Sequence, residues 1–267
     1  MRALLYCVLS DAGAAPSTTV AGVGGHAVSY ARARGLRAAF SHIEDAELIP
    51  SLSRLLDYDR VVEALFGQTA VLPMRYGATF ASEADLIRYV EEHAHRLSAS
   101  LRELEGCVEM GVRVLLLAGE SAPTSEPAPH PAAPTSGRAY LESLRKHLDA
   151  ADPLRARREA ALERCSRAFA GVVVRQRAES SSDERRGFER LLASVQACGA
   201  TAREQPRLLG SLHFLVRRES VVAFKERFRD LRPEAGTELL ISGPWPPYSF
   251  AAPESQIPCM TTGPSHT

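Results

Sequence analysis

The residues with the chemistry to bind a metal or a phosphate do not fall at the spacings that such sites need. His93 and His95 lie two apart in a predicted helix and face different directions, whereas two metal ligands on one helix lie four apart. Residues 20–25 are rich in glycine, which lets backbone N–H groups approach an anion, but no Lys-Ser or Lys-Thr pair follows them. We therefore predict surface histidines and a turn or hairpin at 20–25.

The cysteines have neither the spacing of a zinc site nor the number of a disulfide framework. They are odd in number and widely spaced, with no C-x-x-C pair. The five are Cys7, Cys107, Cys165, Cys198 and Cys259. We expect free thiols in a reducing compartment.

No catalytic motif occurs along the chain. The sequence contains no G-x-S-x-G, no H-E-x-x-H and no phosphate-binding loop. Distant residues can still converge in space, so this absence lowers the expectation of an enzyme without removing it. We expect no catalytic residues, no bound cofactor and no metal.

The overall composition argues against two further classes of protein. Lys plus Arg and Asp plus Glu are equal at 32 each, so no net positive charge favours nucleic-acid binding. No apolar run reaches the roughly 18 residues that a membrane span requires. Hydrophobic residues make up 45% of the chain, which is enough to form a core. We predict a cytosolic protein that neither binds nucleic acid nor spans a membrane.

Arg75 is a charged residue in a position that suggests a specific contact. It follows closely after Pro73, which cannot donate to a strand ladder and so marks a strand end or edge. A guanidinium group can bind an acidic group of a partner or an internal carboxylate such as Glu109. We favour the internal pair and keep the partner contact as the alternative.

Residues 243–250, G-P-W-P-P-Y-S-F, form the stiffest aromatic stretch of the chain. They hold the only Trp and three of the 17 prolines, and each proline fixes its own φ and restricts the residue before it. Such a ribbon can pack against a sheet, or contact a partner at little entropic cost. We favour burial of Trp245 in its own domain. Trp245, Tyr248 and Phe250, with Arg75, are the candidate partner-binding residues.

The elements that position these residues fall into two groups, which predicts an α+β protein of two domains. Apolar runs and capping signals predict strands and helices in the first group. The strands are expected at 2–9, 36–43, 70–74 and 107–117, and the helices at 59–67 and from Ser82 to before Gly106. Residues 118–137 contain five prolines and only two charges, which is typical of a linker.

The second group begins with helical patterns from 138 to about 169, interrupted at Pro153. A short strand is expected at 172–175, and two further strands at 208–216 and 237–241 are joined by a helix after Ser220. This order forms a β-α-β crossover. The domains are therefore expected at 1–117 and 138–250, followed by a flexible tail at 251–267.

Three motifs together resemble the gas vesicle protein F/L family (GvpL/GvpF). They are V-L-P-M-R-Y-G at 71–77, G-C-V-E-M-G-V-R-V at 106–114 and G-P-W-P-P-Y-S-F at 243–250, and the resemblance runs over about residues 1–250. Two departures are Met110, where the family motif more often has Trp, and Tyr76, where it often has Phe. Both substitutions keep bulk.

The resemblance implies a fold and a role. The fold would be two α+β domains, the C-terminal one ferredoxin-like with added helices. The role would be that of an accessory protein in the cytoplasm or on the gas vesicle. Its partners would be the hydrophobic gas vesicle shell protein and other gas vesicle accessory proteins. The family offers no catalytic residues or cofactor to transfer. The alternative is a small-molecule-binding or enzymatic ferredoxin-like protein, suggested by the β-α-β pattern and Arg75.

Overall fold

The computed structural model describes residues 1–12, 16, 20–117, 153–178 and 206–251, which form two compact units. Unit 1 comprises Met1–Glu109, Leu215–Arg218 and Gly243–Thr267, and unit 2 comprises Met110–Phe214 and Glu219–Ser242. The predicted linker at 118–137, and the predicted tail after its first residue, lie outside the described residues.

Unit 1 is built on a sheet whose central strand, β1 (Arg2–Ser10), is almost fully buried. The strand order is β2-β3-β1-β4, with β5 also paired to β1, and β1 runs antiparallel to β3, β4 and β5. The other strands are β2 (Ser29–Ala33), β3 (Leu36–Ile43), β4 (Val71–Pro73) and β5 (Thr79–Phe80). The strands predicted at 2–9, 36–43 and 70–74 are thus confirmed, whereas β2 and β5 were not predicted.

A bulge divides the side chains of β1 between two cores. The pairing with β3 shifts between Leu5 and Cys7, so that Tyr6 is an extra residue. Ala3, Leu5 and Val8 join one hydrophobic cluster, while Leu4, Tyr6, Cys7 and Leu9 join the other. Because a one-residue insertion reverses the alternation of side chains, Tyr6 and the adjacent Cys7 belong to the same core.

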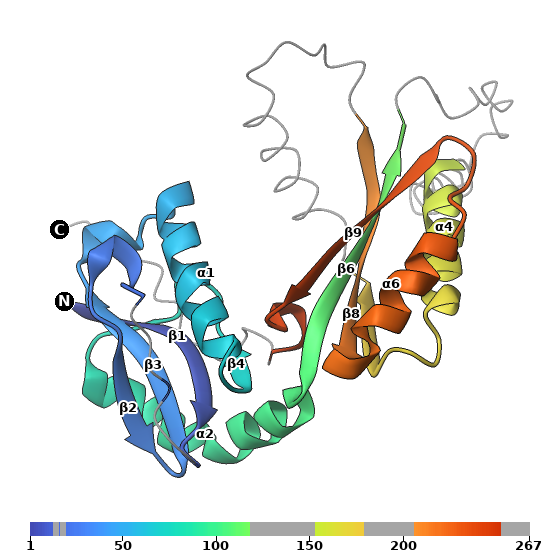
Figure 1. The fold of residues 1–267 in the computed structure, drawn as a ribbon. Coiled ribbons are helices and arrows are strands. Elements are labelled where there is room, and N and C mark those ends of the chain that lie inside the picture. The colour runs from blue at the N-terminus through green and yellow to red at the C-terminus, as the bar shows by residue number, and fades with distance from the viewer. Residues whose placement is uncertain (13–15, 17–19, 118–152, 179–205, 252–267) are drawn as a thin grey trace, which may run out of the picture. The chain divides into compact units, whose positions relative to one another are not determined.

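Two helices of unit 1 cover opposite faces of this sheet (Figure 1). Helix α1 (Leu52–Phe66) packs on the Tyr6 face, and α2 (Glu83–Leu104) packs on the Leu5 face. The Ser82 hydroxyl accepts the Asp85 N–H and begins α2 as predicted. Helix α1 begins seven residues before the predicted start at Asp59, because Ser51 caps its first turn by accepting the Arg54 N–H.

Among its described residues, unit 2 has the element order β6, α4, β7, β8, α6, β9, with sheet order β7-β8-β6-β9. The elements are β6 (Cys107–Leu116), α4 (Pro153–Ala168), β7 (Arg175–Ala178), β8 (Arg207–Arg217), α6 (Val221–Asp230) and β9 (Thr237–Trp245). This is the β-α-β-β-α-β order of ferredoxin-like folds, in which β8 and β9 flank β6. Phe169 stacks on Phe224 at 4.1 Å between ring centroids and closes its core.

Two elements of this half differ from the predicted positions. The strand expected at 172–175 begins only at Arg175, because a turn donates the Val172 N–H to the Phe169 carbonyl. The last segment, 243–250, was expected in the second domain, whereas the structure groups Gly243 onward with unit 1. Its contacts explain this grouping and are described below.

Tyr58 of α1 offers a test of how the helix is joined to the sheet. Its buried hydroxyl lies 2.8 Å from the Leu5 carbonyl and 2.9 Å from the Met74 carbonyl, and burial raises the pKa of the phenol. We expect Tyr58→Phe to lower the free energy of unfolding by about 1–2 kcal/mol, because buried acceptors lose their donor. Urea unfolding of the full chain, followed by circular dichroism, measures this loss.

Tyr30 provides the matched control for this substitution. Its buried hydroxyl has no hydrogen-bond partner among the described residues. Tyr30→Phe removes the same atom without breaking a bond, so its unfolding free energy should stay equal to that of the original chain or rise. Equal losses in the two variants would contradict the role assigned to Tyr58.

Candidate partner-binding site

The end of the aromatic segment is fixed within unit 1. Pro246 and Pro247 are buried, and a short 3-10 turn, η4 (Tyr248–Phe250), follows them. The Tyr248 N–H donates to the Pro246 carbonyl at 2.8 Å, and the Phe250 N–H donates to the Pro247 carbonyl at 3.1 Å. The ring of Phe250 joins the core cluster that also contains Leu5. Phe250 is therefore a core residue.

Two side chains fasten this turn to the helix α1 and the strand β6. The Tyr248 hydroxyl donates to the Asp59 carboxylate at 3.0 Å. The Ser249 N–H and hydroxyl donate to the two carboxylate oxygens of Glu109, at 2.8 and 2.7 Å. Burial, reinforced by the negative charge of Asp59, raises the pKa of Tyr248. Tyr248 is thus placed as a structural anchor, with its phenol neutral.

Trp245 does not have the buried position that we favoured from the sequence. Its side chain is 45% exposed at the end of β9, although Pro246 beside it is buried. The strand β9 has β6 as its only partner in the described sheet, so its other edge carries no strand there. The aromatic candidate residues therefore differ in role. Phe250 and Tyr248 hold the fold, while Trp245 presents an aromatic ring to solvent.

Arg75 lies in the turn between β4 and β5 and is exposed. Its carbonyl accepts the Ala78 N–H at 3.2 Å, and Gly77 within the turn has a φ of 99°, which favours glycine. The preceding carbonyl, that of Met74, is held by Tyr58. The turn that carries Arg75 is thus well fixed. The pair with Glu109 stays a prediction, as does a partner contact of Arg75.

The glycine-rich stretch forms a packed turn, as we predicted. Its 3-10 turn, η1 (Val23–Gly25), is closed by the Gly22 N–H, which donates to the His26 carbonyl at 2.7 Å. A Cβ atom at Gly22 would lie 2.4 Å from the Tyr6 hydroxyl oxygen and 2.5 Å from that of Ser41. Glycine is therefore needed here because a strand side chain approaches its backbone closely.

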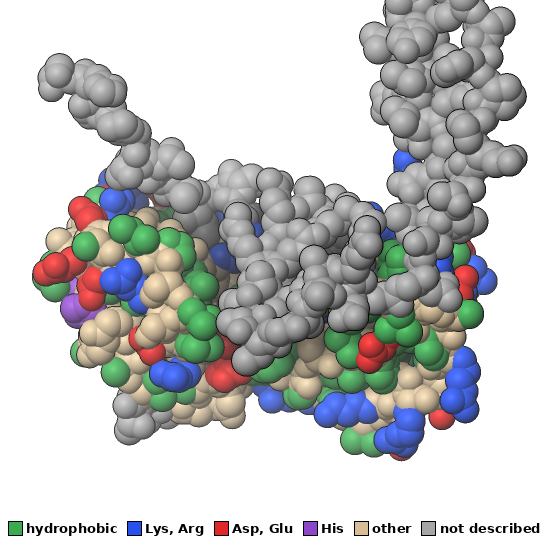
Figure 2. Space-filling model, turned by 90° about the horizontal axis from the view of Figure 1, so that it is seen from above, with side chains coloured by type: hydrophobic (Ala, Val, Ile, Leu, Met, Phe, Trp, Pro, Cys, Tyr) green, Lys and Arg blue, Asp and Glu red, His purple; other side chains and the backbone are tan. Residues whose placement is uncertain are grey.

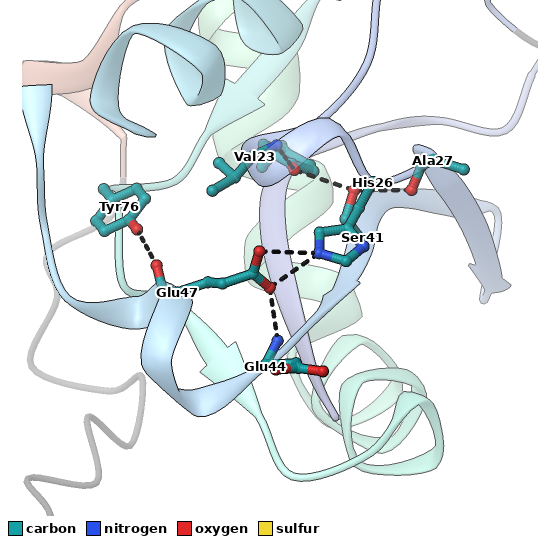
Figure 3. Close-up of polar contacts among 8 residues, drawn as sticks. Val23, His26, Ala27, Ser41, Glu44, Glu47 and Tyr76 are labelled. Atoms are coloured by element: carbon teal, nitrogen blue, oxygen red, sulfur yellow. Dashed lines mark hydrogen bonds and ion pairs between the residues drawn. The ribbon is translucent and has the colours of Figure 1, made fainter. Parts of the chain in front are cut away.

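A chain of hydrogen bonds joins this turn to the sheet (Figure 3). The Val23 N–H donates to the Tyr6 hydroxyl at 3.0 Å, and Tyr6 donates to the Ser41 hydroxyl at 3.0 Å. Ser41 in turn donates to the Ala27 carbonyl at 2.8 Å. Sequence reasoning missed this network, because Tyr6 lies in a run of apolar residues and is 35 positions from Ser41.

Glu47 links the same turn to the 3-10 helix η2 (Asp45–Leu48), as Figure 3 shows. Its carboxylate accepts the Glu44 N–H at 2.9 Å and lies 2.8 Å from Nε2 of His26. The Glu44 N–H, together with His26, lowers the pKa of Glu47 against the opposing effect of burial. The Glu47 carbonyl also accepts the Tyr76 hydroxyl at 2.8 Å. These contacts organise a loop and contain no arrangement for nucleophilic attack.

Within the described ranges, the structure shows no group of three or more His, Cys, Asp or Glu residues arranged to hold a metal. Cys7, Cys107 and Cys165 are buried free thiols, as expected, and burial raises the pKa of each. Cys198 and Cys259 lie outside the described ranges. No described helix combines the length and the apolar character needed to cross a membrane.

The lowered pKa of Glu47 predicts a pH-dependent contribution to stability. A carboxyl group with a folded-state pKa below its unfolded value, about 4.3, stabilises the fold above that pH and loses the effect as the pH falls through the folded pKa. We expect Glu47→Gln to cost about 1 kcal/mol at pH 7 and progressively less below about pH 4. Urea unfolding at several pH values tests this, with Glu91→Gln, an exposed residue of α2, as the control. A pH-independent cost would contradict the assignment.

The sequence matches a known family over almost its whole length. The profile of the family described as "Gas vesicle synthesis protein GvpL/GvpF" matches residues 3–252. The chain is also 30% identical to gas vesicle protein L of Streptomyces sp. (strain CB03234) over 219 residues, which cover 79% of this chain and 73% of the relative.

Two solved structures share the fold. GvpF from Anabaena sp. PCC7120 superposes with a TM-score of 0.63 at 13% identity, covering 94% of this chain and 98% of that one. GvpF from Microcystis aeruginosa gives a TM-score of 0.62 at 14% identity, covering 94% and 99%. The family match and the identity to gas vesicle protein L agree with the three motifs and with the observed α+β fold, and the chain belongs to the GvpL/GvpF family of gas vesicle synthesis proteins.

Proposed function

We propose that this protein is an accessory protein of gas vesicle formation, which binds the hydrophobic shell protein and other accessory proteins during assembly. The observation that carries the proposal is the family match over residues 3–252. The implied place of action is the cytoplasm, at the gas vesicle.

The physical requirements of such a role agree with the surface of the protein. A strongly apolar shell subunit has to be kept from aggregating until it joins the growing wall, so an accessory protein needs accessible apolar groups. Several large hydrophobic side chains are exposed among the described residues, and they include Trp245 at 45%. On the face drawn in Figure 2, hydrophobic side chains reach the surface between charges of both signs.

The accessory role is tested by removing the protein from vesicle-forming cells. We expect cells that lack it to lose flotation and to show few or no gas vesicles by electron microscopy, and a plasmid copy to restore both. Normal vesicles in the deleted strain would contradict the proposal. The alternative, a small-molecule-binding or enzymatic ferredoxin-like protein, would then be examined by ligand screening and by a turnover assay on Arg75→Ala.

Replacing Trp245 tests whether this residue contacts a partner or stabilises the fold. Because the ring is 45% exposed, we expect Trp245→Ala to lower the unfolding free energy by no more than about 1 kcal/mol. Binding to the shell protein, measured by pulldown, should fall, because an exposed ring on a fixed backbone is a typical anchor.

Trp245→Phe is the control, since it keeps an aromatic ring and should keep most of the binding. A large drop in melting temperature with unchanged binding per folded molecule would instead place Trp245 among the structural residues of unit 1.

A further inference from the structure

The beginning of helix α1 carries an exposed apolar face that the core of unit 1 does not use. Ile49, just before the helix, is 67% exposed, and Leu52 is 66% exposed. Leu55 and Leu56 are 42% and 48% exposed. Spacings of three and four residues bring Leu52, Leu55 and Leu56 together on the first turns of the helix, and Ile49 lies three residues before Leu52 in extended chain. We call these four residues the leucine face.

The leucine face lies at the start of α1, before the part of the helix that holds the fold. The buried side chains of the helix come later in its sequence, at Tyr58, Val61, Val62 and Leu65. Single exposed leucines are common on protein surfaces, but adjoining ones that together expose on the order of a few hundred Å² mark interaction sites. The four residues of the leucine face are exposed, so packing in the core of unit 1 does not account for their apolar character.

The charged side chains beside the leucine face make contacts within unit 1. The Arg54 guanidinium donates to the Ile49 carbonyl at 2.8 Å, and Arg60 pairs with Asp57 at 2.9 Å. Asp59, on the same helix, accepts the Tyr248 hydroxyl. With two positive and two negative groups, this part of α1 has no net charge to attract a charged partner. The complementary surface is therefore apolar and uncharged.

The size of the leucine face decides between two kinds of partner. A stable dimer buries about 800 Å² on each protomer, well above what four partly exposed side chains provide. An amphipathic helix instead contacts its partner through a few anchors at spacings of three and four, which matches Leu52, Leu55 and Leu56.

We propose that the leucine face binds the uncharged apolar side of a short helix from another polypeptide. The inference rests on the proposed accessory function, and it takes that polypeptide to be the vesicle shell protein. The contact would bury the leucines against apolar side chains and would need no charge pair. Binding should therefore weaken little between low and high salt.

The first experiment replaces the leucines together. Leu52→Gln, Leu55→Gln and Leu56→Gln in one full-length chain keep helix propensity while removing apolar surface. We expect binding to purified, labelled shell protein to weaken at least about ten-fold, with an unchanged circular dichroism spectrum and melting curve. The control combines Val222→Gln with Leu240→Thr, which removes exposed apolar groups in unit 2. Its binding should not change.

The second experiment asks whether the leucine face is open in the free protein. A Leu55→Cys variant should react with a maleimide as fast as Val222→Cys, and the shell protein should slow only the former; mass spectrometry of each labelled peptide reads the two rates. If Leu55→Cys is already shielded in the free protein, another part of this chain or a second copy occupies the face, and the proposal is overturned. Sedimentation of the free protein distinguishes these two occupants.

Failure of this inference is distinguishable from failure of the accessory function. If cells without the protein form normal vesicles, the accessory function itself fails. If those cells lose vesicles but the triple glutamine variant restores both flotation and shell-protein binding, the accessory function stands and the leucine face is not its docking surface. A steep loss of binding with salt would equally overturn the uncharged contact.

Discussion

The bulge at Tyr6 in β1 is the constraint on which unit 1 depends. It sends Tyr6 and Cys7 into the same core, so that the Tyr6 hydroxyl can bond Ser41 and receive the Val23 N–H. The Tyr6 carbonyl accepts hydrogen bonds from the Met74 N–H and from the Tyr58 hydroxyl. A strand buried on both faces must satisfy its polar groups internally, and one extra residue allows it to hold a turn, a helix and an edge strand together.

The aromatic segment shows how a distant part of the sequence completes this unit. Residues 246–250 bring no strand of their own, yet Ser249 satisfies both oxygens of the nearly buried Glu109, and Tyr248 binds Asp59. A buried carboxylate costs several kcal/mol without such donors, so Glu109 and Ser249 depend on each other. The prolines before them stiffen the chain, which lowers the entropy lost when the turn docks.

The sequence predicted those elements whose local signals and burial agree. Strands β1 and β3 are continuous apolar runs, and α2 has both a Ser82 cap and a long apolar stripe. The start of α1 was missed because Asp59 offers a capping signal inside the helix, although Leu55, Tyr58 and Val62 continue one apolar stripe at spacings of three and four. Burial of Trp245 was wrongly expected, because the aromatic composition and the prolines of residues 243–250 do not reveal on which side of β9 the ring lies. The Tyr6 network depends on contacts between distant residues, which local patterns do not contain.

The residues that fix the backbone lie next to the exposed apolar residues along the chain. Helix α1 is fixed at Tyr58 and Asp59, directly after the leucine face, and the chain after Trp245 is fixed by Tyr248, Ser249 and Phe250. An apolar group on a fixed backbone loses little conformational freedom when it binds, so more of the free energy of burial is available for association. Under the proposed function, these interior hydrogen bonds would make the exposed leucines and the tryptophan more effective as contacts. A protein that covers apolar surfaces of other polypeptides benefits from rigidity beneath its own apolar surface.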